Sequence, residues 1–122
     1  MHPQDHDACA SRIEGSMRKC GPADHELLIE GAMLAAAHRL NAHLHRLGIS
    51  DVATDIMHTY LLTINEYRRL CLVDNASMVA LAAIEDLRPA FVRGDHTGAG
   101  EAAQRATGLL ALIQGRTSAS GA

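Results

Sequence analysis

The feature that most constrains the fold is a run of strong helix formers that ends at a glycine. Residues 35–48 read AAAHRLNAHLHRLG, and Ala, Leu and Arg are among the residues most favourable in a helix. A glycine directly after such a run is typical of a helix C-terminal cap. We therefore predict a helix that starts near Pro22, runs to Leu47 and stops at Gly48.

The rest of the chain has the same character. Hydrophobic residues make up 48% of the 122 residues but aromatic residues only 2%, with no Trp. The core must therefore be aliphatic, and the residues that favour strands are scarce. Apolar side chains recur at helical spacing in further segments. We predict an all-α protein, an antiparallel four- to five-helix bundle, with the other helices at about 7–20, 50–73, 75–94 and 101–114.

Three signals shape those helices. Asp7 is a good N-cap for the first one, and Asp74-Asn75 is a capping signal between the third and the fourth. Pro89 lies inside the fourth helix and is expected to kink or end it. Residues 1–6 and 115–122 are small or polar without periodicity, so we expect disordered ends around one domain, 7–114.

Charge and composition exclude several classes of function. A net charge of −3 with a pI near 6.2 argues against a nucleic-acid surface, which is normally basic. No apolar run is long enough to span a membrane, and the first residues do not resemble a signal peptide. We expect a cytoplasmic protein without membrane contact. Cysteines number three, an odd count that predicts free thiols.

The candidate site lies on the predicted helix that ends at Gly48. One side of this helix is an aliphatic stripe, made of Ile29, Met33, Ala36, Leu40, Leu44 and Leu47. His38 and His45 share the opposite side, together with Asn41 and Leu34. Two imidazoles seven residues apart are about 10.5 Å apart along a helix, too far to hold one metal ion easily. We therefore predict no metal and no cofactor. The favoured interpretation is a second buried face, either a dimer interface or satisfied bundle histidines, with ligand binding and catalysis as alternatives.

Other candidates are weaker. His58, on the following segment, is included with the same face, whereas His43 borders the aliphatic stripe. His2 and His6, with the neighbouring acids Asp5 and Asp7, could bind metal weakly, although a disordered terminus is the favoured interpretation. No nucleophile motif and no Glu-x-x-His pair occurs, so we predict no catalytic residue.

The order of segments resembles the HEPN superfamily of small helical domains. The matching pieces are residues 35–49, the segment DIMH at 55–58, the segment DLRPAF at 86–91 and the closing helix at 101–113. The resemblance implies a helical bundle, usually a homodimer, with roles in toxin–antitoxin pairs or RNA cleavage. Ribonucleases of that family use an Arg followed closely by a His. Arg88 is the positional match, but His96 follows after seven residues and beyond Gly94.

Two functional hypotheses follow. The leading one is a non-catalytic HEPN-like bundle that acts through homodimerisation or through binding another protein, in a toxin–antitoxin type of system. The alternative is an RNA-directed ribonuclease or a nucleotide-binding module that uses Arg88 or the face formed by His38, Asn41 and His45.

Overall fold

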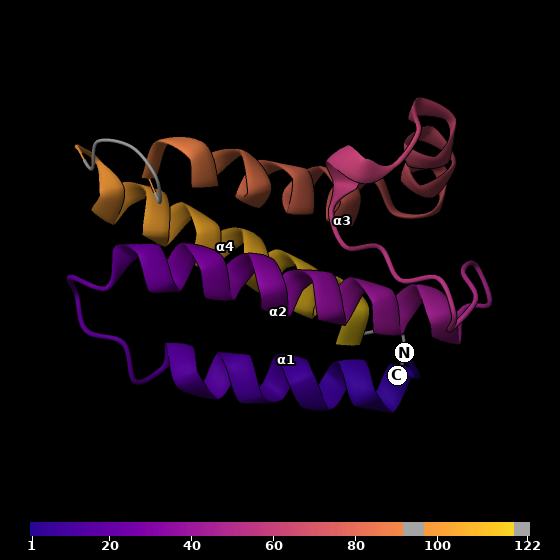
Figure 1. Cartoon of the computed structure of the whole chain (residues 1–122), viewed down its shortest axis with the longest axis horizontal. Coiled ribbons are helices and arrows are strands. Elements are labelled where there is room, and N and C mark those ends of the chain that lie inside the picture. Colours follow the sequence, from indigo (N-terminus) through magenta and orange to yellow (C-terminus); the bar gives the residue numbers. More distant parts are fainter. Residues whose placement is uncertain (92–96, 119–122) are drawn as a thin grey trace.

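The computed structural model describes residues 1–91 and 97–118 and confirms the all-α prediction. Four helices form the bundle, with one short 3-10 helix, η1, between the second and the third (Figure 1). No strand occurs in the residues described. The elements, in chain order, are α1 (Pro3–Met17), α2 (His25–Arg46), η1 (Thr59–Leu61), α3 (Ile64–Phe91) and α4 (Ala99–Ser118).

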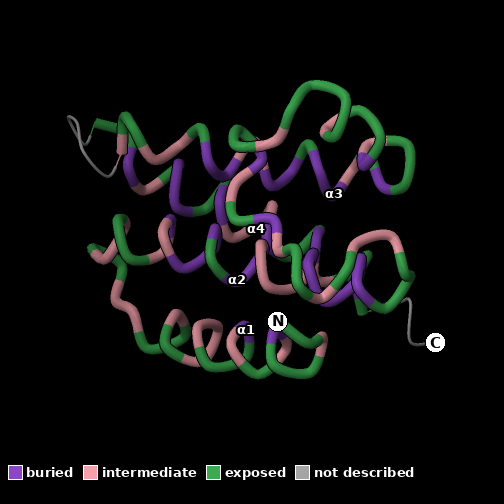
Figure 2. The backbone as a smooth tube through the Cα atoms, turned by 45° about the vertical axis from the view of Figure 1, so that its right-hand side comes forward, coloured by how far each residue is buried: buried purple, intermediate pink, exposed green. Residues whose placement is uncertain are grey.

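Helix α2 is the centre of the bundle. It packs against α1 on one side and against α4 and α3 on the other (Figure 1). Buried residues accordingly concentrate on α2 and on the sides of its neighbours that face it (Figure 2). The predicted aliphatic stripe is confirmed except at its end, because Leu47 is 49% exposed. The buried members of the stripe are Ile29, Met33, Ala36, Leu40 and Leu44.

Helix α1 begins four residues earlier than predicted. It starts at Pro3, a residue favoured in the first turn because its fixed φ suits a helix and its missing N–H would be unpaired there anyway. Residues 3–6 are therefore helical rather than disordered. The helix also ends earlier, at Met17, and α2 starts at His25 rather than near Pro22.

Close contact between α1 and α2 depends on a glycine. A Cβ added at Gly31 would lie 2.8 Å from Cγ of Met17, closer than two carbons can normally approach. The bare backbone at Gly31 thus lets α1 lie directly against α2.

The predicted helix at 50–73 is wrong in its first half. Gly48 has φ of 70°, and two hydrogen bonds form a Schellman motif there: Ile49 N–H donates to Leu44 O at 3.0 Å and Gly48 N–H to His45 O at 3.1 Å. The chain then reverses direction and runs without a regular helix to η1. Apolar spacing alone could not reveal this, because Ile56 and Leu62 pack on the core from an irregular segment.

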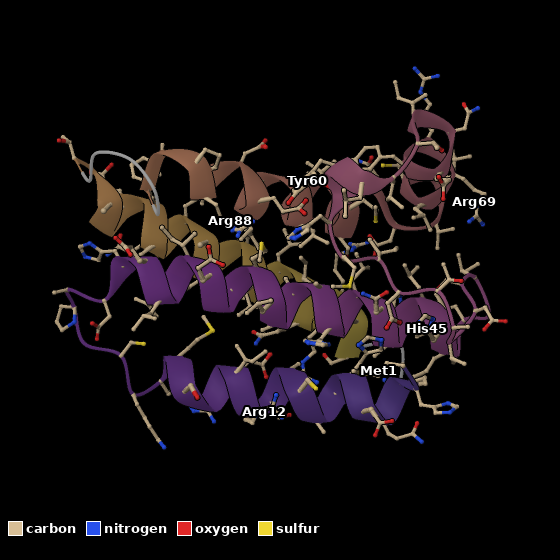
Figure 3. All side chains as sticks on the ribbon, in the orientation of Figure 1. Met1, Arg12, His45, Tyr60, Arg69 and Arg88 are labelled. Atoms are coloured by element: carbon tan, nitrogen blue, oxygen red, sulfur yellow. The ribbon has the colours of Figure 1, made fainter. Side chains whose placement is uncertain are left out.

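Helix α3 begins at Ile64 with a capping box. Glu66 N–H donates to Oγ1 of Thr63 at 3.1 Å, and Thr63 N–H donates to Oε1 of Glu66 at 3.0 Å. The predicted boundary at Asp74 is confirmed as a break inside α3, with φ of −152° and ψ of 84°. The part before the break projects from the bundle at the upper right of Figure 1 and carries Arg69, labelled in Figure 3.

The ends of the last two helices also differ from prediction. Helix α3 continues through Pro89 to Phe91, and its non-helical backbone is at Asp74 rather than at the proline. The predicted end at Gly94 lies outside the described residues. Helix α4 extends to Ser118, so residues 115–118 are helical rather than disordered.

Two further expectations can be compared with the structure. Cys9, Cys20 and Cys71 are free thiols, as predicted. Within residues 1–91 and 97–118, no helix combines the length and the apolar character needed to cross a bilayer.

The break in α3 yields a stability prediction. Asp74 is buried, accepts the N–H of Ser77 at 3.1 Å and accepts Nε–H of Arg116 at 2.7 Å. Asp74→Ala removes both interactions and should lower the free energy of unfolding by about 1–2 kcal/mol at pH 7. Urea unfolding followed by circular dichroism measures this, with the exposed Asp86→Ala as the matched control.

The decrease in the free energy of unfolding caused by Asp74→Ala should depend on pH. Burial raises the pKa of Asp74, but hydrogen bonds from Ser77 and Arg116 outweigh it, so the pKa lies below its usual value. A carboxylate of this kind stabilises the fold above about pH 4 and loses that effect as pH falls through its lowered folded-state pKa. The gap between wild type and Asp74→Ala should therefore shrink towards pH 3, and an equal gap at both pH values would contradict this account.

Candidate metal centre

Three potential metal ligands from three segments meet where α1 begins and α2 ends. Nε2 of His6 lies 2.9 Å from Oδ1 of Asp55, and Nε2 of His45 lies 2.8 Å from the same oxygen. The three ligand atoms are all within 4.8 Å of one another. His45 is labelled beside Met1 in Figure 3. The side chains of His6 and His45 are only 3% and 0% exposed, and that of Asp55 is 25% exposed.

The segment after α2 is held in place by the side chain of Asn41. Its Nδ2 donates to Ile56 O at 2.8 Å, and its Oδ1 accepts the N–H of Ile56 at 2.7 Å. These two bonds fix the backbone immediately after Asp55. The Schellman turn at Gly48 brings Ser50 back beside His45. His45 is thus positioned at the end of α2, Asp55 by the side-chain amide of Asn41, and His6 by α1.

The second ring nitrogen of each histidine also has a partner. Nδ1 of His45 lies 3.1 Å from Ser50 O and 2.8 Å from Ser50 Oγ. A carbonyl oxygen can only accept, so a hydrogen bond to Ser50 O needs the proton on Nδ1, whereas the Ser50 hydroxyl can donate to Nδ1 when the proton is on Nε2. Nδ1 of His6 lies 2.9 Å from Nδ1 of His38. Burial, followed by repulsion from His6, lowers the pKa of His38 and favours its neutral ring, which can donate to or accept from His6 at this contact.

These partners allow two arrangements of the ring protons. With the protons on Nε2, both rings donate to the carboxylate of Asp55, in agreement with the hydrogen bonds that lower its pKa. With the protons on Nδ1, two Nε2 lone pairs and one carboxylate oxygen face one another, and these three atoms can then bind a metal cation in place of the two protons.

The charge of Asp55 suits the binding of a cation. Burial raises the pKa of Asp55, but hydrogen bonds to His45, His6 and the amino group of Met1 outweigh it and lower the pKa to about 2. The carboxylate is therefore ionised at neutral pH. Oδ2 of Asp55 lies 3.2 Å from the Met1 nitrogen.

The donor set fits a divalent first-row transition ion. Two imidazole nitrogens and one carboxylate oxygen are the ligands of zinc and of non-haem iron sites. Adjacent ligands bound about 2.1 Å from one ion are about 3.0 Å apart in octahedral and about 3.4 Å apart in tetrahedral coordination, so the two ring-to-carboxylate distances would lengthen slightly on binding zinc. Metal-bound histidines usually donate their other N–H to a carbonyl or a similar group, which is the arrangement of His45 with Ser50.

The six candidate residues of the sequence analysis, Leu34, His38, Asn41, His45, His58 and Arg88, make separate contacts in the structure. His45 is a ligand candidate and His38 contacts His6, whereas Asn41 holds the backbone of Ile56. Leu34 is 45% exposed, so the predicted second buried face does not include it. The expectation of no metal rested on the wide spacing of His38 and His45 and on a disordered terminus around His6, whereas the structure brings His6 and Asp55 beside His45.

His58 and Arg88 belong to other contacts. Nδ1 of His58 donates to Oε2 of Glu85 at 2.9 Å. Nε of Arg88 donates to Oε1 of Glu30 at 2.8 Å, and this hydrogen bond raises the pKa of Arg88. His96, the partner expected from the resemblance, lies outside the described residues. His43, predicted only to border the aliphatic stripe, is buried, and its Nδ1 has no hydrogen-bond partner in the part of the chain that the structure describes.

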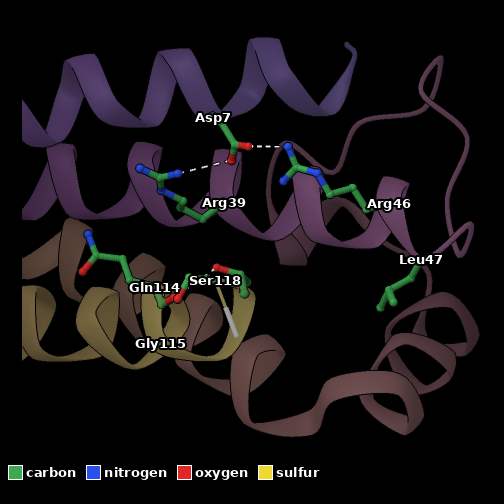
Figure 4. A pocket seen from close by; sticks show the side chains of 8 residues that line it. Asp7, Arg39, Arg46, Leu47, Gln114, Gly115 and Ser118 are labelled. Carbon is green, nitrogen blue, oxygen red and sulfur yellow. Dashed lines mark hydrogen bonds and ion pairs between the residues drawn. The ribbon is translucent and has the colours of Figure 1, made fainter. Parts of the chain in front are cut away.

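A cavity of about 600 Å³ lies between α1, α2 and α4, with Asp7, the residue after His6, in its wall (Figure 4). Asp7 forms ion pairs with Arg39, at 3.2 Å, and with Arg46. Arg39 also pairs with Glu14, outside the wall, at 2.6 Å, so the two arginines of the wall are matched by two carboxylates. The ion pairs of Asp7 fasten the start of α1 to α2, next to the candidate metal centre.

Sequence reasoning missed His6 and Asp55 as partners of His45. One signal could have found His6: it continues the spacing of Ala10, Ile13 and Met17 back by one turn, which places it on the face that packs against α2. No local pattern identifies Asp55, because its position depends on the reversal of the chain at Gly48 and on the hydrogen bonds of Asn41.

Comparisons with protein-family models, with curated proteins and with solved structures find no match. A functional assignment therefore rests on the geometry of the chain itself.

The role of Asn41 gives a second prediction. Asn41→Ala leaves both the N–H and the C=O of Ile56 without their partner in a buried site, so the free energy of unfolding should fall by about 2–4 kcal/mol. Leu34→Ala, on the same helix but 45% exposed, is the matched control and should change it by less than about 0.5 kcal/mol. Urea unfolding measures both. Equal small effects in the two variants would show that the Asn41 hydrogen bonds do not hold the segment.

Proposed function

We propose that this chain is a metal-binding helical bundle that holds one divalent first-row transition ion with His6, His45 and Asp55. The observation that carries the proposal is the convergence of two imidazole nitrogens on one carboxylate oxygen, each at under 3 Å, in an arrangement that can hold one cation. The two histidine side chains are almost fully enclosed. Enclosed ligands favour holding an ion over turning over a substrate.

Zinc is the ion for the first test. Isothermal titration calorimetry on the metal-free protein should give one Zn²⁺ per chain. At free Zn²⁺ of 100 times Kd, binding to the folded state alone adds about 2.7 kcal/mol of stability, which should raise Tm by roughly 10 °C for a chain of this size. Cobalt offers a spectroscopic check, because its visible absorption reports the ligand geometry.

Variants separate the ligands from their neighbours. His45→Ala and Asp55→Asn each remove a ligand and should weaken Zn²⁺ binding by more than about 100-fold, whereas His38→Ala removes only the partner of a ligand and should weaken it about 10–100-fold. His2→Ala, an exposed histidine four residues before His6, is the control and should bind as wild type does. Loss of binding in His2→Ala with retention in Asp55→Asn would reject this site in favour of weak binding at the terminus.

A second candidate function, partner binding by homodimerisation, is favoured by a separate observation. Four large apolar side chains within eight residues are each about two-thirds exposed, namely Met57, Tyr60, Leu61 and Ile64. Exposed apolar side chains that lie close together are typical of interaction surfaces. This is also the mode of action that the HEPN resemblance implies, and the resemblance itself stays a prediction.

Light scattering coupled to size-exclusion chromatography tests the dimer. The chain has a mass of 13.0 kDa, and wild type at micromolar concentration should elute with twice that mass. Leu61→Gln should shift it to the monomer, whereas Leu112→Gln, on an exposed position of α4, should leave it dimeric. A wild-type monomer under these conditions would reject homodimerisation.

The ribonuclease alternative has less support. Arg88 is engaged with Glu30, and the face of His38, Asn41 and His45 is occupied by contacts to α1 and to the segment after α2. An RNA degradation assay comparing wild type with Arg88→Ala and His45→Ala separates this alternative from the metal site.

A further inference from the structure

One short segment joins the candidate metal centre to the exposed apolar side chains. Asp55, the ligand, is followed by Ile56, whose backbone is bonded to Asn41. Met57 comes next and is 67% exposed. Only four residues separate Asp55 from Tyr60. We refer to residues 55–61 as the connecting segment.

The far end of the connecting segment is anchored on α3. Glu85, whose side chain is 2% exposed, accepts Nδ1–H of His58 at 2.9 Å and the backbone N–H of Thr59 at 3.0 Å. The hydroxyl of Thr59 also donates to Glu85. The ring of Tyr60 stacks on His58, with centroids 4.7 Å apart and planes at 13°. The segment is therefore tied to the bundle at Asp55, Ile56 and Glu85, with exposed apolar side chains between and after the ties.

The ties at Asp55 and Ile56 cannot move independently. The N–H of Ile56 belongs to the same planar peptide as the carbonyl of Asp55. A displacement of Asp55 therefore strains the two hydrogen bonds of Asn41, which are buried and costly to break.

A bound metal ion changes the interactions that fix the position of Asp55. With an ion bound, Asp55, His6 and His45 share one cation. Without it, Asp55 is held by its hydrogen bonds to the two rings and by the Met1 amino group, each a weaker interaction than coordination to a shared divalent ion.

We infer that occupancy of the His6–His45–Asp55 centre controls the order of the connecting segment and thereby the presentation of Met57, Tyr60 and Leu61. The inference rests on the proposed metal binding and adds its regulatory output. A ligand shifts an equilibrium between two states only through a difference in its affinity for them. Here the difference is direct, because Asp55 is both a ligand and a member of the segment.

The chain offers a built-in probe. It has no Trp and two tyrosines, Tyr60 and Tyr67. In the Tyr67→Phe variant all tyrosine emission comes from Tyr60, at the end of the connecting segment. Zn²⁺, which does not quench fluorescence by electron transfer, should change this emission in a saturable way with an end point at one ion per chain. The Tyr60→Phe variant, which reports Tyr67 on α3 instead, should show little change.

Hydrogen exchange provides the second measurement. At free Zn²⁺ of ten times Kd, openings that release the ion become about tenfold rarer. Exchange of the amides at 56–61 should slow by that factor, while amides of the projecting part of α3, at 66–73, should be unaffected. Asp55→Asn in either experiment should abolish the response.

The outcomes distinguish control of the connecting segment from metal binding itself. If calorimetry detects no Zn²⁺ binding, the metal-binding proposal fails. If calorimetry gives one ion per chain but neither the Tyr60 emission nor the exchange at 56–61 responds, metal binding stands and the control of the connecting segment is overturned.

Discussion

The buried amide of Asn41 is the interaction on which the arrangement of this bundle most depends. It takes the place of regular secondary structure for the backbone of Ile56, supplying one donor and one acceptor where a helix or a strand would have supplied them. Backbone groups that are buried must be paired, so an irregular connection can lie against the core of a helical bundle only where a side chain provides the pairing. In this chain one residue of α2 does so, and the position of Asp55 follows.

The polar side of α2 is thus explained by contacts within one chain. A helix with buried polar groups opposite its aliphatic stripe needs partners for them. Here α1 brings His6 to His38, while the segment after Gly48 brings Ser50 and Asp55 to His45. The imidazoles form a row with His6 in the middle, its ring centroid 5.1 Å from that of His38 and 5.3 Å from that of His45. His38 and His45, two turns apart on one helix, are connected by a third ring from another helix.

The sequence predicts the helical class, the central helix and the break at Asp74, because these depend on local propensity, on spacing and on caps. It also contained an unused signal for the start of α3, since Thr63 and Glu66 have the spacing of a capping box. The segment at 50–63 could not be predicted in this way. Met57, Tyr60, Leu61 and Ile64 have the apolar spacing of a helix but are exposed, and Ile56 and Leu62 pack on the core instead. Only the chain reversal at Gly48 and the tertiary contacts of Asn41 and Glu85 decide this arrangement. The candidate centre is equally non-local, because its three members lie in three separate segments.

Helix α1 has a small apolar hold on the bundle. Its buried residues are His6 and Ala10, of which the first is polar. Its remaining attachments include the contact at Gly31 and the ion pairs of Asp7 and Glu14 with Arg39. An ion bound at His6 and Asp55 would act as a cross-link between positions 49 residues apart. Unlike a disulfide, such an ion is released on unfolding, so its stabilising effect would depend on the free metal concentration, and the metal would serve as a removable cross-link for the outermost helix.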